Sequence, residues 1–104
     1  MEQVETDKLL FLNVKEASFY LRAINNNVRQ KILKLLEERP KITVTEIFIH
    51  LRLVQSITSQ HLAILRRTKI VTTIREGKHV YYELNNQRLQ ELHHFIKSIL
   101  IESD

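Results

Sequence analysis

The sequence predicts a mainly α fold that carries one β-hairpin, and three observations lead to this fold class. Two helical patterns separated by a short break lie between Thr43 and Val71. The second of these helices opens with small polar residues, as helices that enter the DNA major groove do. An alternating segment, Val71 to Leu84, follows directly and contains the only glycine of the chain. This order predicts a winged helix-turn-helix with about five helices and a two-stranded wing.

Composition limits the domain organisation and the class of partner. The chain has 104 residues, 43% of them hydrophobic, and no linker, repeat or low-complexity run, so we expect a single domain over residues 1–104. The net charge of +4 permits a polyanionic partner. The absence of cysteine excludes disulfides and thiolate metal sites. No apolar run is long enough for a signal peptide or a membrane span, so we expect a cytoplasmic protein without membrane contact.

The N-terminal segment predicts one long helix or two short ones, because residues 9–24 are rich in apolar side chains. Asparagines at positions 25–27 are expected to end it, since asparagine tolerates turn and left-handed conformations. Asn27 can then cap a helix from Val28 to Glu38, which Pro40 stops. The buried stripe predicted for that helix is Val28, Ile32, Leu35 and Leu36.

The helix-turn-helix pair begins with a capping box. Thr43 is followed three residues later by Glu46, which predicts a helix from Val44 to about Leu51 with Ile47 and Leu51 facing inward. The second helix of the pair is expected to start at Ser56. Its predicted buried face is Thr58, Leu62 and Leu65, and its predicted outer face is Ser56, Ile57, Ser59 and Gln60.

The hairpin and the last helix complete the domain. Alternation predicts that Val80, Tyr82 and Leu84 face the core and that residues 79, 81 and 83 face outward, with Glu76-Gly77 as the turn. The last helix is expected from Asn86 onward. Its apolar stripe is wider than one small core needs, which predicts a partner helix.

The outer face of the second helix carries the candidates for contact with DNA bases. Gln60 is the first candidate, because an amide can bond adenine through two atoms, and the alternative is a glutamine that only meets water. Ile57 can contact a thymine methyl group or, alternatively, a neighbouring turn. Ser56 is expected to cap its helix and to contact a phosphate.

Other polar and basic residues are candidates for contact with the DNA backbone. Gln55 and His61 are two of them, although a structural role within the domain is slightly favoured for His61. The cations at the hairpin tip can reach phosphates or the minor groove. Arg66 and Arg67 are explained more simply as charges near a helix C-terminus. The complete set of DNA-binding candidates is Gln55, Ser56, Ile57, Ser59, Gln60, His61, Arg75, Lys78 and His79.

These elements together resemble the arsenical-repressor (ArsR) family of winged-helix transcriptional repressors, over roughly Leu21 to Leu100. The motifs that carry the resemblance are Val44-Thr45-Glu46-Ile47, the segment from Gln55 to Arg66 and the segment from Gly77 to Leu84. The resemblance implies a homodimer whose first and last helices form the subunit interface. The apolar residues expected in that interface are Leu9, Leu10, Leu12, Phe19, Leu92, Phe95, Ile96, Ile99 and Leu100.

The chain departs from this family at three places. Lys69 stands where the family usually has a left-handed glycine, which predicts some strain at the end of the second helix. A cysteine pair that binds metal in the family is replaced by Phe48 and His50. A second family metal site aligns with Asn86, Arg88, Ile99 and Glu102, and only one of these four is an ordinary ligand. We therefore expect no metal and no cofactor, and regulation that is independent of metal or uses an effector that the sequence does not identify.

The predicted function is a sequence-specific, DNA-binding transcriptional regulator of double-stranded DNA. The resemblance favours a homodimeric repressor that binds an imperfect palindrome. The alternative is a winged-helix module that binds another protein, but its outer face would then expose apolar or aromatic anchors. An enzyme is not expected, because the chain has no glycine-rich phosphate loop and no nucleophile-base arrangement.

Overall fold

The computed structural model describes residue 15 and residues 18–102, with the side chains of 95, 96 and 98–102 excepted. The interface predictions for Leu9, Leu10 and Leu12 fall outside the described residues. The predictions for the side chains of residues 95, 96, 99 and 100 fall outside them as well.

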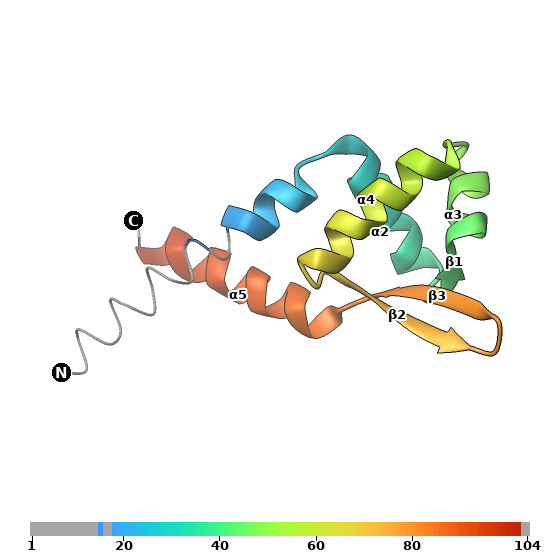
Figure 1. Ribbon diagram of the computed structural model, residues 1–104. Helices are drawn as coiled ribbons and strands as arrows, with labels where there is room; N and C mark the ends of the chain where they lie inside the picture. The colour runs from blue at the N-terminus through green and yellow to red at the C-terminus, as the bar shows by residue number, and fades with distance from the viewer. Residues whose placement is uncertain (1–14, 16–17, 103–104) are drawn as a thin grey trace.

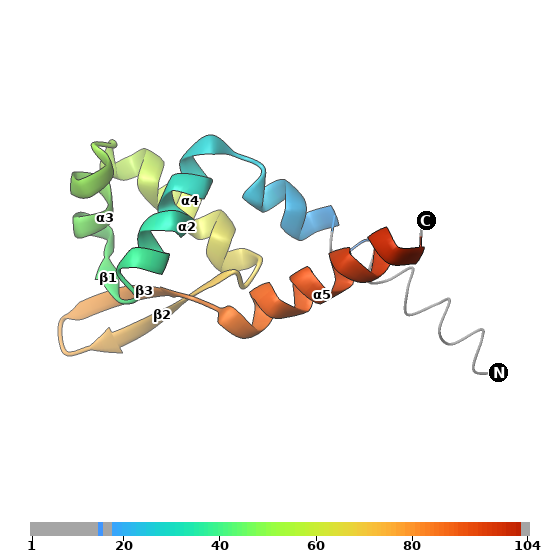
Figure 2. The same ribbon diagram turned by 180° about the vertical axis from the view of Figure 1, so that it is seen from behind.

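The structure confirms a mainly α fold with a β-hairpin wing (Figure 1). A helical segment covers residues 18–24. The elements that follow are α2 (Asn27–Glu38), β1 (Ile42–Thr43), α3 (Val44–Leu51), α4 (Gln55–Arg67), β2 (Val71–Glu76), β3 (His79–Leu84) and α5 (Asn86–Glu102). The wing extends from one end of the molecule, whereas the segment 18–24 and α5 lie at the other end, as Figure 2 shows from behind.

The sheet has three strands in the described chain, one more than the sequence predicted. Its order is β1-β3-β2, and all neighbours are antiparallel. β1 is a two-residue strand in which Ile42 pairs with Tyr82 and Thr43 pairs with Tyr81. Ile42 is fully buried, so this short strand fixes the base of the wing to the helices.

The core lies among α2, α3, α4 and the base of the sheet. The predicted inner residues of α2 are confirmed, because Ile32, Leu35 and Leu36 are buried and Val28 packs against them. The side chains that are at most 2% exposed are Ile32, Leu36, Ile42, Ile47, Leu62, Leu65, Ile70, Val71, Thr58 and Thr68. This core holds α4 by one face and leaves its other face outside.

The ends of two elements differ from the prediction by one residue. Asn26, not Asn27, caps α2: its extended backbone suits the cap position, and its side chain accepts a 3.0 Å hydrogen bond from the Arg29 amide. The wing turn is Gly77-Lys78, because Glu76 is still paired with His79. Gly77 has a φ of 61°, which fits a two-residue turn with glycine in first position.

The capping box of α3 is confirmed. The Thr43 hydroxyl accepts a 3.2 Å hydrogen bond from the Glu46 amide, and the Glu46 carboxylate accepts a 3.3 Å bond from the Thr43 amide. Two of the amides that a helix start leaves without partners are thereby satisfied. This local pattern fixes where α3 begins.

Lys69 adopts the left-handed conformation expected for this position, with a φ of 63°. Its amide donates to the Arg66 carbonyl at 3.0 Å, and the Ile70 amide donates to the Leu65 carbonyl at 3.0 Å. These two bonds end α4 in the way a glycine usually does. The Lys69 side chain is exposed, as predicted.

We expect Lys69→Gly to raise the free energy of unfolding by about 0.5–1 kcal/mol, because glycine avoids the steric cost of this conformation but loses more chain entropy on folding. Urea denaturation measures the change. The matched control is Arg67→Gly at the last residue of α4, which is not in the left-handed conformation, and it should lower stability by up to about 1 kcal/mol. A lower stability for Lys69→Gly would contradict strain at this position.

Candidate nucleic-acid interface

The two faces of α4 are divided as the sequence predicted. Thr58, Leu62 and Leu65 are at most 1% exposed, whereas Ser56, Ile57, Ser59 and Gln60 are all exposed. The Thr58 hydroxyl donates a 3.0 Å hydrogen bond to the Val54 carbonyl, so this polar group is satisfied inside the core. That bond allows a threonine to be buried at this position without an unsatisfied hydroxyl.

The start of α4 differs from the prediction. The helix begins at Gln55, and its N-cap is Val54, which makes no side-chain capping bond. The expected capping role of Ser56 is therefore wrong. Ser56 is the second residue of α4 and does not occupy the N-cap position. The first amides of α4 thus carry a partial positive charge toward solvent, which favours an anion such as a phosphate.

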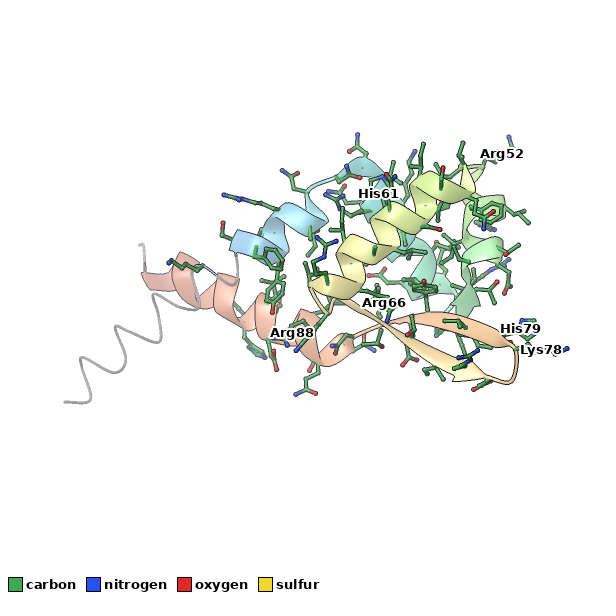
Figure 3. The ribbon with its side chains drawn as sticks, in the orientation of Figure 1. Arg52, His61, Arg66, Lys78, His79 and Arg88 are labelled. Atoms are coloured by element: carbon green, nitrogen blue, oxygen red, sulfur yellow. The ribbon has the colours of Figure 1, made fainter. Side chains whose placement is uncertain are left out.

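The turn between α3 and α4 presents a cation that the sequence did not reveal. Arg52 has a φ of 55°, and its amide donates to the Ile49 carbonyl at 3.2 Å. The Leu53 amide donates to the Phe48 carbonyl at 2.9 Å, which closes the turn. The Arg52 side chain is exposed beside the start of α4 (Figure 3). A left-handed arginine is not recognisable in sequence, since glycine or asparagine usually occupies such a position.

The wing tip is basic and exposed, as predicted for Arg75, Lys78 and His79. Figure 3 shows Lys78 and His79 at the tip, on the same side of the molecule as Arg52. The one acidic residue of the turn region, Glu76, is paired with Lys41. Because that carboxylate already has a partner, the tip keeps an excess of positive charge.

The inner face of the wing was predicted only in part. Tyr82 and Leu84 pack against the core as expected. Val80 is 40% exposed, so its prediction as a core residue is wrong. Val80 pairs with Arg75 near the tip of the hairpin, where the two strands have passed beyond the helices that cover their base.

His61 lies at the edge of the buried face of α4 and makes a contact within the domain. Its Nδ1 lies 3.1 Å from Nη1 of Arg29 on α2. Burial, followed by the charge of Arg29, lowers the pKa of His61 below its ordinary value. A guanidinium group only donates hydrogen bonds, so Nδ1 accepts and the proton of the neutral ring is on Nε2.

Arg29 connects three parts of the chain. Its Nε donates to the Ala23 carbonyl and its Nη2 donates to the Arg22 carbonyl at 3.3 Å, at the end of the helical segment 18–24. With the contact to His61, one guanidinium thus joins that segment, α2 and α4. This geometry agrees with the structural role favoured for His61.

We expect the stability of the domain to fall as the pH falls below about 6.5. The pKa of His61 is lower in the folded chain than in the unfolded chain, so its contribution is complete above the unfolded value and is lost as the pH falls through the folded value. Urea denaturation at pH 7.5, 6.5 and 5.5 measures this dependence. His61→Gln should reduce the slope, whereas His79→Gln, at the exposed wing tip, should preserve it. An unchanged slope in His61→Gln would contradict the prediction.

The expected interface residues that the structure describes lie at the end opposite the wing. Phe19 is 50% exposed, and Leu21, which lies in the same helical segment but is not one of the expected interface residues, is 44% exposed. Leu92 on α5 is only 8% exposed, because it belongs to the core of its own chain. The guanidinium of Arg88 lies 5.4 Å from the ring centre of Tyr20 and joins α5 to the segment 18–24. Phe19 therefore offers a partner far more apolar surface than Leu92 does.

Within residues 15 and 18–102, no group of three or more His, Asp or Glu side chains is placed to hold a metal ion. No helix of that same part of the chain is long and apolar enough to cross a membrane.

Comparison with known proteins connects this geometry to a family. Residues 26–81 match the family described as "Bacterial regulatory protein, arsR family". The chain is 30% identical over 83 residues to the transcriptional repressor PagR of Bacillus anthracis. This match covers 80% of this chain and 83% of PagR. It is 36% identical over 80 residues to the transcriptional activator HlyU of Vibrio cholerae, and this match covers 77% of this chain and 73% of HlyU.

Solved structures agree with these matches. The crystal structure of PagR superposes with a TM-score of 0.70 at 28% identity, over 86% of this chain and 98% of PagR. An ArsR-like regulator from Rhodococcus sp. RHA1 superposes with a TM-score of 0.82, over 88% of this chain and 86% of that protein. Its identity of 20% supports the fold alone.

Proposed function

Because this chain belongs to the arsR family of bacterial regulatory proteins and is a DNA-binding transcriptional regulator, we propose that it is a homodimeric repressor of its target promoter. The observation that carries the proposal is the exposed polar face of α4 beside a basic wing. PagR and SdpR, both about 30% identical to the chain, are repressors. HlyU is an activator, so the direction of regulation is the part that needs its own test.

In this proposal α4 enters the major groove by its first two turns. Ser56, Ser59 and Gln60 are small or flexible polar residues, and they allow the helix backbone to approach the base edges closely. Gln60 bonds an adenine, and Gln55 and Ser56 contact the backbone together with the free amides of the helix start. His61 stays bonded to Arg29 and supports α4 from inside.

The cations on both sides of α4 contact phosphates. Arg75, Lys78 and His79 reach the backbone or the minor groove from the wing, and Arg52 contacts a phosphate from the α3–α4 turn. These contacts set the orientation of the protein on DNA without reading sequence. They also make the affinity depend on salt, since each neutralised phosphate releases counterions.

Dimerisation uses Phe19 and the apolar residues predicted on α5. It places two copies of α4 about 34–36 Å apart, which is one turn of B-DNA. The proposed operator is therefore an imperfect palindrome with half-sites one helical turn apart, and occupancy of the promoter blocks transcription.

The first test measures binding of the purified protein to the DNA upstream of its own gene and to a scrambled duplex, by fluorescence anisotropy over a salt series. We expect a preference of roughly a thousandfold or more for the upstream DNA, with affinity that falls steeply as salt rises. Lys78→Ala should weaken binding to both duplexes and reduce the salt slope by about one for each subunit. Equal and weak binding to both duplexes would contradict the proposal.

Transcription in vitro from the same promoter separates repression from activation. A repressor lowers the amount of transcript over the concentration range in which it occupies the operator. An increase over that range would overturn the repressor assignment and leave DNA recognition intact.

A further inference from the structure

Three branched aliphatic side chains are exposed around the start of α4. Ile49 on α3 is 64% exposed, Val54 at the N-cap is 61% exposed, and Ile57 in the first turn of α4 is 44% exposed. Only Ile57 lies on the helix face that carries Ser56, Ser59 and Gln60. An apolar side chain in the middle of a polar face needs an explanation.

The internal packing of the domain does not supply that explanation. Thr58, the next residue, is fully buried with its hydroxyl bonded to the Val54 carbonyl. A domain optimised only for its own core would bury the isoleucine and expose the threonine, because the larger hydrocarbon gains more from leaving water. The alternative from the sequence, contact with a neighbouring turn, leaves 44% of Ile57 exposed and so accounts for only part of its surface.

The surroundings of Ile57 indicate what kind of partner covers the exposed part of its side chain. The start of α4 has no side-chain cap, and Arg52 lies beside it, so a polyanion is the partner that fits the charge of this end. Among the four DNA bases only thymine presents an apolar group, its C5 methyl, in the major groove. A branched hydrocarbon on a helix that enters this groove fits that methyl group.

We propose that Ile57 is a specificity-determining residue that contacts the C5 methyl group of a thymine in each half-site of the operator. Ile57 and Gln60 are three residues apart on α4 and are therefore neighbours on its surface. The thymine lies at a base pair next to the one that Gln60 contacts. This inference rests on the proposed function, since it requires an operator that α4 enters through the major groove.

Replacement of thymine by deoxyuridine tests the inference, because the two bases differ only in the methyl group. In the operator identified by footprinting, each thymine is replaced in turn, symmetrically in both half-sites. We expect one position at which the replacement weakens wild-type binding by about fourfold for each half-site, or about fifteenfold for both, the value for burial of one methyl group. At that position Ile57→Ala should bind the two operators equally.

Two matched variants show whether the effect belongs to Ile57. Val54→Ala and Ile49→Ala remove aliphatic side chains that are more exposed than Ile57 and lie outside this face, and both should keep the wild-type ratio between thymine and deoxyuridine. Circular dichroism and thermal unfolding check that each variant is folded. The three substitutions are at exposed positions, so stability should change little.

The outcomes separate this inference from the proposed function. Specific binding to the operator with no thymine sensitive to loss of its methyl group overturns the inference and leaves the function standing. A methyl effect that persists in Ile57→Ala overturns it as well, since another residue then makes the contact. Equal binding to operator and scrambled duplex overturns the proposed function, and the inference falls with it.

Discussion

Gln60→Ala is expected to weaken operator binding by about 1–3 kcal/mol for each half-site, or roughly 5- to 150-fold. The physical reason is that an amide bonded to adenine through two atoms supplies discrimination that alanine cannot replace. Gln60 is exposed and alanine favours the helix, so the fold of the variant should be unchanged. Anisotropy with operator and scrambled duplexes at one salt concentration measures the effect.

The distinguishing feature of this result is its selectivity. Binding to the scrambled duplex should stay the same, because non-specific affinity comes from the phosphates. Gln90→Ala is the matched control, since Gln90 is an exposed glutamine on α5 and does not belong to the polar face of α4. An equal loss of affinity for both duplexes would mean that Gln60 contacts the DNA backbone. No loss of affinity for either duplex would mean that Gln60 contacts only water.

Arg29→Ala is expected to lower the free energy of unfolding by about 2–4 kcal/mol. The guanidinium donates to the Ala23 and Arg22 carbonyls and to His61, and its removal leaves two partly buried acceptors and one exposed acceptor without their donor. Hydrogen bonds from charged groups contribute more than neutral ones, and an unsatisfied buried acceptor adds its own cost. Urea denaturation, with comparison of the m-values, measures the loss.

Two further variants serve as comparisons for the loss of stability in Arg29→Ala. Gln30→Ala removes a single exposed hydrogen bond to the Ile24 carbonyl and should cost about 1 kcal/mol or less. Arg29→Lys keeps the charge, but one ammonium group cannot reproduce the planar set of donors, so its loss should lie between the other two. If the free energy of unfolding of Arg29→Ala were within about 0.5 kcal/mol of the wild-type value, the guanidinium would not hold the three segments together.

Local patterns in the sequence were enough to predict most of the helices and the outer face of α4. Thr43 and Glu46 are three residues apart, and their reciprocal bonds require nothing beyond that spacing. The division of α4 into a buried and an exposed face also follows from helix periodicity, since the spacing of Leu62 and Leu65 puts both on one face, which is the face that is buried. Predictions of this kind depend on neighbours within about one turn.

The features that the sequence did not reveal depend on distant parts of the chain or on finer backbone geometry. β1 is a strand only because Ile42 and Thr43 meet β3, nearly forty residues later along the chain. The contact between Arg29 and His61 joins residues 32 positions apart. The start of α4 was misplaced for another reason: serine is a strong capping residue, and the bond from Thr58 to the Val54 carbonyl allows a valine to take that place.

The uncapped start of α4 has a consequence for the exchange of amide protons with solvent. Within an α-helix the first amides have no carbonyl of the same helix to bond, and Val54 supplies no side-chain acceptor in their place. In the free protein the amides of Gln55, Ser56 and Ile57 should therefore exchange with deuterated water faster than those of the next turn, where the Thr58 amide already bonds the Val54 carbonyl. When a phosphate accepts their hydrogen bonds, the same amides should become protected, so the rate of exchange at three backbone positions reports whether DNA is bound.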